Sequence, residues 1–491
     1  ERKGFQPSGD RISTSALRRS FCTRSRAATG AEMSLKAAIR SHSRALASCY
    51  CRLYSSFRAD DLRIQVTNKP GSKPDTNSLT FGTQFSDHMF EVNWTLQHGW
   101  GAPEIKPLAP FVMHPASKVF HYAQECFEGL KAYRCVDGTI RVFRPMENMK
   151  RMLRTAERGN LPQVFYFGTS GFLAFARPGA DSAPKHAPKG HCPLQAAESK
   201  TQTPCPPLHA VAALLYTVTY YYGMAMSPMQ FDGAELVKCM KKLISIDSEW
   251  VPHSDQCSLY VRPTIIAIEP TLGLYTSHHV KLFVITSPVG AYYPTGLKPV
   301  SLLADPQFVR AWPGGCGSVK LGSNYAPTIA VQAYALKEHN CQQVLWLFGD
   351  DHLMTEVGSM NLFIYWINEN GEEEMVTPAL ESGIVLPGIT RKSLLQLAQE
   401  WNEFKVTEQD IPMKKFVKAL KEGRVREVFG AGTACVVSPV NKIIYEGEEL
   451  HIGSESETQS QSSSLTQRFY DTLLDIQYFR TPHKWMETLD V

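Results

Sequence analysis

One stretch of 67 residues, 163–229, breaks an otherwise regular pattern and limits how this chain can fold. It holds only six charged residues but eight prolines, and its middle is low-complexity sequence. A segment this long without structure of its own is uncommon inside a compact domain. The entropy cost of closing a loop grows slowly with its length, so a domain can still fold around the segment. We therefore interpret 163–229 as an atypical insertion between two helices, with a retained intervening sequence as one explanation.

The sequence around the insertion has the periodicity of strands and helices. Before it, strand-like alternation leads into a helical pattern over 146–159, and after it a second helical pattern covers 233–250. With 491 residues, of which 43% are hydrophobic, the chain is long and apolar enough for two or three domains. Apolar residues share one face of the first helix: Met149, Met152, Leu153 and Ala156.

A short segment containing proline and glycine, 291–299, separates two regions that each mix strands with helices. Two strand patterns, 258–268 and 280–289, precede it, and further strands and helices follow it. We expect an α/β protein with a small N-terminal domain over 76–290, which contains the insertion, and a large C-terminal domain over 300–491.

The amino-terminal region, 1–57, has the composition of a leader and not of a folded domain. Residues 1–58 carry 12 Lys and Arg against 3 Asp and Glu, and Met33 opens a stretch with basic residues, Ser and Ala but no acid. This composition is typical of a mitochondrial transit peptide, so we expect delivery to the mitochondrial matrix and cleavage near Tyr54–Phe57. An ordinary basic tail is the alternative interpretation.

The remaining charge and the cysteines exclude several classes of function. Outside 1–58 the chain carries 39 Lys and Arg against 44 Asp and Glu, which argues against a nucleic-acid-binding protein. The long apolar run 208–226 contains His209 and many tyrosines, so we do not expect a membrane span. The 12 cysteines form neither a CxxC pair nor a cluster with zinc-ligand spacing, so we expect reduced thiols and no metal site.

Two residues of the C-terminal region could carry covalent and acid–base chemistry. Lys320 lies in the segment PGGCGSVKLGSNYAPT, where glycines let the backbone pass close to a ligand, and Tyr325 follows five residues later. Glu356 lies at the end of an apolar strand, where a carboxylate is either buried and paired or part of a site. Taken alone, each of these residues also has an ordinary structural explanation.

Three further segments could bind an anion. Ile389 and Thr390 lie where a helix should begin, and the amides and dipole of a helix start suit a phosphate. Thr433 lies in a glycine-containing turn, and Arg151 lies on the first amphipathic helix. A plain helix start and an exposed arginine are the alternatives. Together with a lysine able to form a Schiff base and a carboxylate able to hold a pyridinium, these elements match the requirements of pyridoxal phosphate.

Nine short motifs occur along the chain in the order of a known family. They are FEGLKAY, NMKRM, SLYVRP, GSVKLGSNYAP, QQVLWLFG, TEVGSMN, PGITR, RVREVFG and GTAC. In this order they resemble the branched-chain amino acid aminotransferases, most closely the animal mitochondrial members, over about 78–453 without the insertion. The resemblance implies the pyridoxal-phosphate fold type IV: two α/β domains with the cofactor between them, in a homodimer.

The resemblance also implies roles around the cofactor. Lys320 would be the Schiff-base lysine and would move a proton between the substrate α-carbon and the cofactor, which requires a lowered pKa. Glu356 would keep the pyridine nitrogen protonated, and Tyr325 would hydrogen-bond the ring hydroxyl oxygen. Ser359 stands where close relatives usually have threonine, and it keeps the hydroxyl. The phosphate would be held by Arg151, the amides of Ile389 and Thr390, and Thr433.

One substrate pocket would serve both an aliphatic side chain and the γ-carboxylate of glutamate. Aromatic walls supply apolar area, and tyrosine or arginine tips supply hydrogen-bond donors. Leu272 and Leu274 would reach the pocket of the partner subunit, with ordinary core leucines as the alternative. By resemblance the pocket residues would be Phe81, Tyr122, Phe127, Tyr260, Arg262 and Tyr292, with the backbone of Ala434 and Cys435 receiving the α-carboxylate.

The implied function is reversible transamination of L-leucine, L-isoleucine and L-valine with 2-oxoglutarate, in a ping-pong cycle through the pyridoxamine form. Small-molecule substrates and a second subunit are the expected partners, without nucleic acid or membrane. Two features depart from the family: Ser438 replaces the second cysteine of a CxxC usual in animal members, and the insertion follows the helix that carries Arg151. The alternatives are a non-catalytic product disabled by the insertion, or another fold-type IV enzyme such as a D-amino acid aminotransferase or a lyase.

Overall fold

The structure is a computed structural model that describes residues 56–161, 164–165, 231–290, 297–453 and 464–489. The chain divides into two units, 1–52 and 53–491, and the first lies outside the described residues. Nearly all of the predicted leader and of the predicted insertion lies outside them too. Among the residues that are described, no helix is long and apolar enough to span a bilayer.

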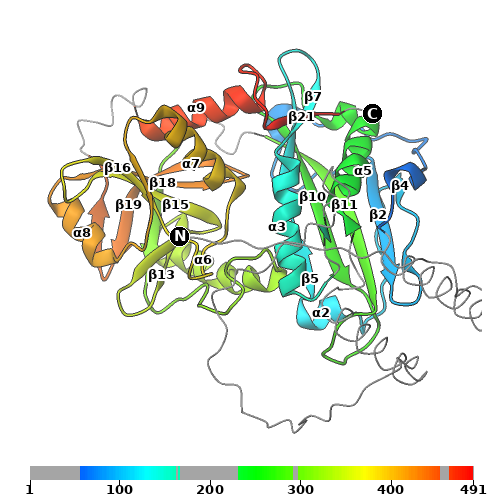
Figure 1. Ribbon diagram of the computed structural model, residues 1–491, viewed down its shortest axis with the longest axis horizontal. Coiled ribbons are helices and arrows are strands. Elements are labelled where there is room, and N and C mark those ends of the chain that lie inside the picture. The colour runs from blue at the N-terminus through cyan, green and yellow to red at the C-terminus, as the bar shows by residue number, and fades with distance from the viewer. Residues whose placement is uncertain (1–55, 162–163, 166–230, 291–296, 454–463, 490–491) are drawn as a thin grey trace, which may run out of the picture. The chain divides into compact units, whose positions relative to one another are not determined.

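A ten-stranded sheet forms the first layer of the unit 53–491. Its strands are β1 (Arg63–Ile64), β2 (His88–Thr95), β3 (Gly99–Trp100), β4 (Glu104–Pro107), β5 (Glu125–Phe127), β6 (Leu130–Arg134), β7 (Ile140–Phe143), β10 (Ser258–Ala267), β11 (His279–Val289) and β21 (Met486–Thr488). They run in the order β1-β4-β2-β11-β10-β6-β7-β21, with β3 beside β2 and β5 beside β10. Helices α3 (Pro145–Arg158) and α5 (Gly233–Ile246) share one apolar core with this sheet (Figure 1). The short helix α2 (Lys118–Tyr122) precedes β5.

A nine-stranded sheet forms the second layer. Its strands are β12 (Val300–Ala304), β13 (Gln343–Phe348), β14 (Leu353–Val357), β15 (Met360–Ile367), β16 (Glu373–Thr377), β17 (Lys405–Glu408), β18 (Val425–Gly432), β19 (Val436–Tyr445) and β20 (Glu448–His451). Their order is β14-β13-β12-β19-β18-β15-β16-β17, with β20 beside β19. The helices are α6 (Ala326–His339), α7 (Ile389–Trp401), α8 (Met413–Lys421) and α9 (Leu465–Gln477).

The side-chain alternation of β15 explains why helices cover both faces of the second sheet. Leu362 and Ile364 belong to one core with α8, whereas Phe363, between them, belongs to another core with α7 and α9. Successive side chains of a strand point to opposite faces, so each face needs its own cover. This arrangement fixes the start of α7 against the sheet.

The predicted helices on either side of the insertion are confirmed, and each has an identifiable start. α3 begins at Pro145, whose fixed φ suits the first helical position. α5 begins after Asp232, whose side chain accepts a hydrogen bond from the Ala234 amide at 2.9 Å. The predicted strands 258–268 and 280–289 are β10 and β11. The ends of the insertion meet in a short parallel pair, β8 (Val164–Phe165) and β9 (Phe231–Asp232).

Both ends of the described chain differ from the predicted boundaries. Phe57, which the sequence places in the leader, is buried, and its ring lies 5.4 Å from that of Trp100 and 5.7 Å from that of Phe231. At the other end, β21 pairs with β7 in the first sheet, although the sequence assigns 300–491 to the second domain. Both differences arise from contacts between distant segments, which local composition does not reveal. The division into two domains itself stays a prediction.

Candidate active site

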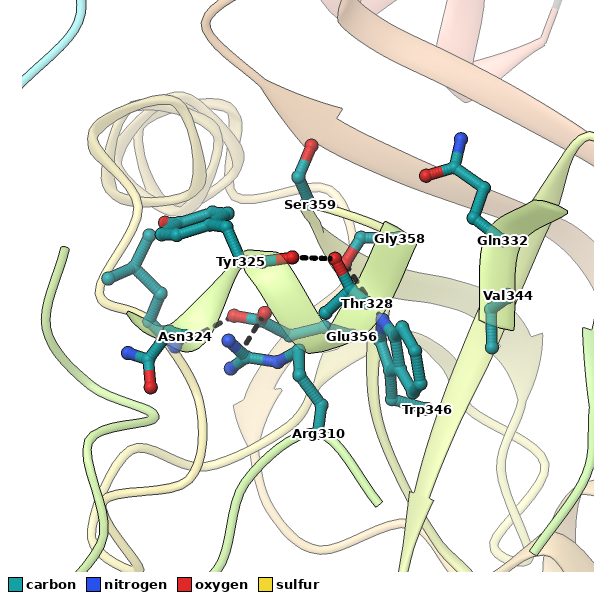
Figure 2. Close-up of a pocket in the computed structure, with 11 residues that line it drawn as sticks. Arg310, Asn324, Tyr325, Thr328, Gln332, Val344, Trp346, Glu356, Gly358 and Ser359 are labelled. Carbon is teal, nitrogen blue, oxygen red and sulfur yellow. Dashed lines mark hydrogen bonds and ion pairs between the residues drawn. The ribbon is translucent and has the colours of Figure 1, made fainter. Parts of the chain in front are cut away.

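A cavity of about 320 Å³ lies where residues of both sheets converge. A smaller hollow of about 40 Å³, whose lining residues Figure 2 shows, adjoins it. The two share Tyr325, Ser359 and Leu386. Most of the predicted site residues therefore meet at one place. The larger cavity is lined by Phe81, Phe127, Gly129, Arg151, Tyr260, Arg262, Lys320, Tyr325, Ser359, Asn361, Leu386, Gly388, Ile389, Thr390, Ala431, Gly432, Thr433 and Ala434.

Lys320 contacts residues of the first sheet although it precedes α6 of the second layer. Its amide donates to the hydroxyl of Thr155 on α3 at 3.0 Å, and its carbonyl accepts from the Phe127 amide at 3.2 Å. Its Nζ lies 3.0 Å from the hydroxyl of Tyr325. Burial, together with the nearby Arg151 guanidinium, lowers the pKa of Lys320 from 10.5 to about 7. A lysine with this pKa is partly neutral at neutral pH and can act as a nucleophile or a base.

Glu356 lies on β14 and lines the smaller hollow. One carboxylate oxygen accepts from the Leu386 amide at 2.7 Å, and the other lies 2.9 Å from Nη2 of Arg310. Figure 2 shows Arg310 and Glu356 turned toward one another, close to Tyr325. Burial raises the pKa of Glu356, while the Arg310 guanidinium and the Leu386 amide oppose that rise. A carboxylate held in this way can accept a charge-assisted hydrogen bond from a cationic ring nitrogen.

Arg151 reaches the cavity from α3 and is paired with Glu128, which follows β5. Its Nε donates to Oε1 of Glu128 at 2.8 Å, and its Nη2 donates to Oε2 at 2.7 Å. Both side chains are buried. The pair presents the arginine, and not the glutamate, to the cavity.

The start of α7 and the turn between β18 and β19 both line the cavity. α7 starts at Ile389, so the amides of Ile389 and Thr390 belong to its first turn and have no partner within the helix. Thr433 lies in the turn between β18 and β19. A side chain at Gly388 would collide with the amide oxygen of Asn361, so a larger residue here would have to displace that buried side chain. A helix start of this kind is a suitable site for phosphate.

Aromatic rings line the side of the cavity that belongs to the first sheet. The rings of Phe81 and Tyr260 meet edge to face at 5.0 Å. Nη2 of Arg262 donates to the Tyr260 hydroxyl at 2.9 Å, and its guanidinium lies 4.7 Å from the ring centre of Phe127. Nε of Arg262 is buried without a hydrogen-bond partner in the described part of the chain. A bound group that accepts a hydrogen bond would satisfy it.

Comparison with known proteins places this arrangement in a family. The amino-transferase class IV model matches residues 222–443. The mitochondrial branched-chain-amino-acid aminotransferase of Bos taurus is 44% identical over 442 residues, covering 89% of this chain and 94% of that protein. The cytosolic one of Caenorhabditis elegans is also 44% identical and covers 87% of each chain. The chain belongs to the branched-chain amino acid aminotransferase family.

Solved structures share the fold of this aminotransferase. The branched-chain amino acid aminotransferase of Escherichia coli matches with a TM-score of 0.54 at 19% identity, over 82% of this chain and 99% of that one. The Thermobaculum terrenum protein, described as the PLP-form, matches with a TM-score of 0.54 at 14% identity, over 83% of this chain and 100% of that one. At such low sequence identity, these matches show the fold alone. They confirm the predicted fold type IV.

Some predicted site residues of the aminotransferase do not line the larger cavity. Tyr122 lies on α2, and its hydroxyl donates to the Leu272 carbonyl. Cys435 is buried beside the cavity, with its Sγ 3.2 Å from Sδ of Met360. Tyr292 lies outside the described residues. Leu272 and Leu274 are 62% and 81% exposed, so the alternative that they are core leucines is wrong.

The structure adds three residues that sequence reasoning missed: Glu128, Arg310 and Asn361. Glu128 and Asn361 lie inside the motifs FEGLKAY and TEVGSMN, and a polar residue beside a strand break was the available signal. Arg310 has no local signal, because its importance depends on Glu356, which is distant in sequence.

Proposed function

We propose that the protein is a pyridoxal-5'-phosphate-dependent enzyme that transfers the amino group reversibly between L-leucine, L-isoleucine or L-valine and 2-oxoglutarate. The products are the branched-chain 2-oxo acids and L-glutamate. One observation carries the proposal: Lys320, whose pKa is lowered, lies in a cavity that has an arginine and a helix start on its wall and a buried carboxylate beside it. The names of the similar mitochondrial and cytosolic relatives support the substrate class.

The residues of the cavity suit the cofactor. Arg151, the first-turn amides of α7 and Thr433 would hold the phosphate. Glu356 would accept a hydrogen bond from the protonated ring nitrogen, Tyr325 would face the ring hydroxyl, and Ser359 would supply a further hydroxyl. The volume of about 320 Å³ is within the usual range for a small-molecule pocket.

Lys320 would carry the proton transfer. Bound pyridoxal phosphate supplies an aldehyde that condenses with amines and a ring that accepts electrons. The neutral Nζ of Lys320 would accept the proton from the α-carbon of the amino acid, and the Tyr325 hydroxyl at 3.0 Å keeps Nζ in position. Arg310 would favour the ionised form of Glu356, which in turn favours a cationic ring.

The substrate would lie against the aromatic side of the cavity. Phe81, Phe127 and Tyr260 offer apolar area for a branched aliphatic side chain, and Arg262 offers a guanidinium to the γ-carboxylate of glutamate. The backbone of Ala434 would receive the α-carboxylate. By resemblance alone, the proposal also includes Tyr122, Tyr292 and Cys435.

We also propose a homodimer in the mitochondrial matrix. The exposed side chains of Leu272 and Leu274 would complete the pocket of a second subunit. Because mitochondrial and cytosolic relatives are equally similar, the compartment rests on the basic, acid-poor composition of the leader.

Visible absorbance of the purified protein with pyridoxal phosphate tests the proposed reaction. Adding L-leucine should change the absorbance of the bound cofactor, and adding 2-oxoglutarate should restore it. D-leucine is the control, and a response to D-leucine alone would indicate a D-amino acid aminotransferase. Binding only after deletion of 163–229 would indicate that the insertion disables the site, and no binding with or without it would contradict the proposal.

A further inference from the structure

A second buried carboxylate, Glu128, lies behind the cavity wall and takes no part in the proposed chemistry. Its side chain has no exposed surface, and it stands between β5 and β6, directly before Gly129. It does not line the cavity, although both Gly129 and its pairing partner Arg151 do. Burying a carboxylate is costly unless it is paired and hydrogen-bonded, so a specific arrangement must hold it.

The carboxylate of Glu128 is held by two residues of one helix face. Oε1 accepts from Nε of Arg151 at 2.8 Å, and Oε2 accepts from Nη2 at 2.7 Å. Oε2 also accepts from Nδ2 of Asn148 at 2.8 Å and from the Gly129 amide at 3.3 Å. Asn148 and Arg151 are three residues apart on α3, so they lie on the same face. Both carboxylate oxygens are therefore hydrogen-bonded.

The same contacts fix the plane of the guanidinium. In the described part of the chain, the hydrogen bonds of the Arg151 guanidinium all go to Glu128. A bidentate pair through Nε and Nη2 leaves Nη1 free for a ligand. Without such a pair, a long side chain would have to lose its rotamer freedom each time it bound an anion.

We propose that Glu128 is a positioning residue, which holds the Arg151 guanidinium so that it can bind the phosphate of the cofactor. The inference rests on the proposed function, because it takes the phosphate end of the cofactor to lie at Arg151. The charge of Glu128 works against this role, since a nearby carboxylate weakens the attraction between Arg151 and a phosphate. Positioning and charge thus predict opposite effects of removing the carboxylate.

The test compares the affinity of the apoprotein for pyridoxal 5'-phosphate and for pyridoxal, which lacks the phosphate. The dissociation constant of pyridoxal divided by that of pyridoxal 5'-phosphate measures what the phosphate contributes to binding. Glu128→Gln should lower this ratio roughly tenfold, as is common when the partner of a binding residue is lost. Glu374→Gln is the matched control, because Glu374 is also buried and hydrogen-bonds Trp366 and Thr407, neither of which lines the cavity.

Two further readouts separate positioning from general loss of stability. The charge of Glu128 raises the pKa of the Lys320 amine. Removing that charge should therefore lower the pH at which capture of pyridoxal by Lys320 of the apoprotein is half-maximal. In an Arg151→Met background, Glu128→Gln should leave the affinity ratio unchanged, because the residue acts through Arg151. If Glu128→Gln does not fold, Asn148→Ala removes one support and should lower the ratio by a smaller factor.

An unchanged or higher ratio in Glu128→Gln would overturn the inference, as would an unchanged ratio in Asn148→Ala if the first variant does not fold. A further drop in the Arg151→Met background would overturn it too. Failure of the unaltered protein to bind pyridoxal 5'-phosphate would instead overturn the proposed function, so the two failures are distinguishable.

Discussion

Two buried Arg–Glu pairs flank Lys320, and they present opposite members toward it. In the pair on the first sheet, Arg151 lines the cavity and Glu128 lies behind it. In the pair at the second sheet, Glu356 and Arg310 both line the smaller hollow, but Glu356 is the one among the charges that act most strongly on Lys320. Nη2 of Arg310 donates to the backbone carbonyls of Gly317 and Ile384. The residue types are the same, and the difference lies in which member acts more strongly on Lys320.

This difference gives the cavity a direction. A positive group suits a phosphate at one end, and a negative group suits a cationic ring nitrogen at the other. Each pair loses hydration on burial, and its mutual attraction offsets this loss only with good geometry. The two pairs therefore contribute polarity more than stability, and they would let a cofactor bind in one orientation only.

The largest effect should come from the residue between the two pairs. Lys320→Met removes the proposed nucleophile and base, so transamination should fall by about 10³-fold or more. Activity with L-leucine and 2-oxoglutarate measures the loss. Tyr325→Phe keeps the amine and is the control, with a clearly smaller loss expected. Equal losses in both variants would show that the surroundings of Lys320, and not its amine, limit the reaction.

Breaking the second pair should affect the rate and spare the phosphate end. Glu356→Gln removes the charge that would stabilise a cationic ring, so kcat should fall by about 10²- to 10³-fold. The affinity ratio for pyridoxal 5'-phosphate and pyridoxal should stay the same, because Arg151 is intact. A changed ratio with an unchanged kcat would reverse the roles assigned to the two pairs.

The pH dependence of Lys320 tests the balance of charges between the pairs. With a pKa of about 7, the amine of Lys320 is mainly neutral only above pH 7. The rate at which the apoprotein captures pyridoxal phosphate should therefore rise about tenfold per pH unit below pH 7 and level off above it. The sign for folding is opposite to that of a salt-bridged lysine. The unfolded lysine, with a pKa of 10.5, binds more protons between pH 7 and 10.5, so stability should rise with pH across this window. Lys320→Met should remove that rise, and stopped-flow absorbance and urea unfolding measure the two effects.

The smallest effect on the site should come from the insertion. Its ends already meet in the pair β8–β9, so replacing 166–230 with a Gly/Ser linker of about six residues should leave kcat unchanged. Shortening the loop about tenfold should raise the free energy of unfolding by about 2 kcal/mol. Steady-state kinetics and urea unfolding check both values. A large gain in activity would show that the insertion obstructs the site.

The sequence predicted those site residues that have a local signal, at both ends of the site. The start of α7 and the turn at Thr433 could be recognised because helix starts and glycine turns have local signals. Lys320 and Glu356 were found because a lysine among glycines and a carboxylate on an apolar strand are unusual in their local context. The fold followed from motifs in family order, and the family is confirmed by the comparisons.

What the sequence did not predict depends on long-range contacts. Neither Glu128 nor Arg310 was assigned a role, because each matters through a partner on another element. Phe57 was assigned to the leader, because its burial against Trp100 and Phe231 requires the folded sheet. The predicted roles of the site residues remain predictions until the variants are measured.

The ring nitrogen of bound pyridoxal phosphate gives the most direct test of the direction of the cavity. The nitrogen can be labelled with ¹⁵N, and its chemical shift reports whether it is protonated. We expect a protonated nitrogen in the unaltered protein and in Arg151→Met at saturating cofactor, but an unprotonated one in Glu356→Gln. A nitrogen that stays protonated in Glu356→Gln, or that loses its proton in Arg151→Met, would contradict the opposite roles of the two pairs.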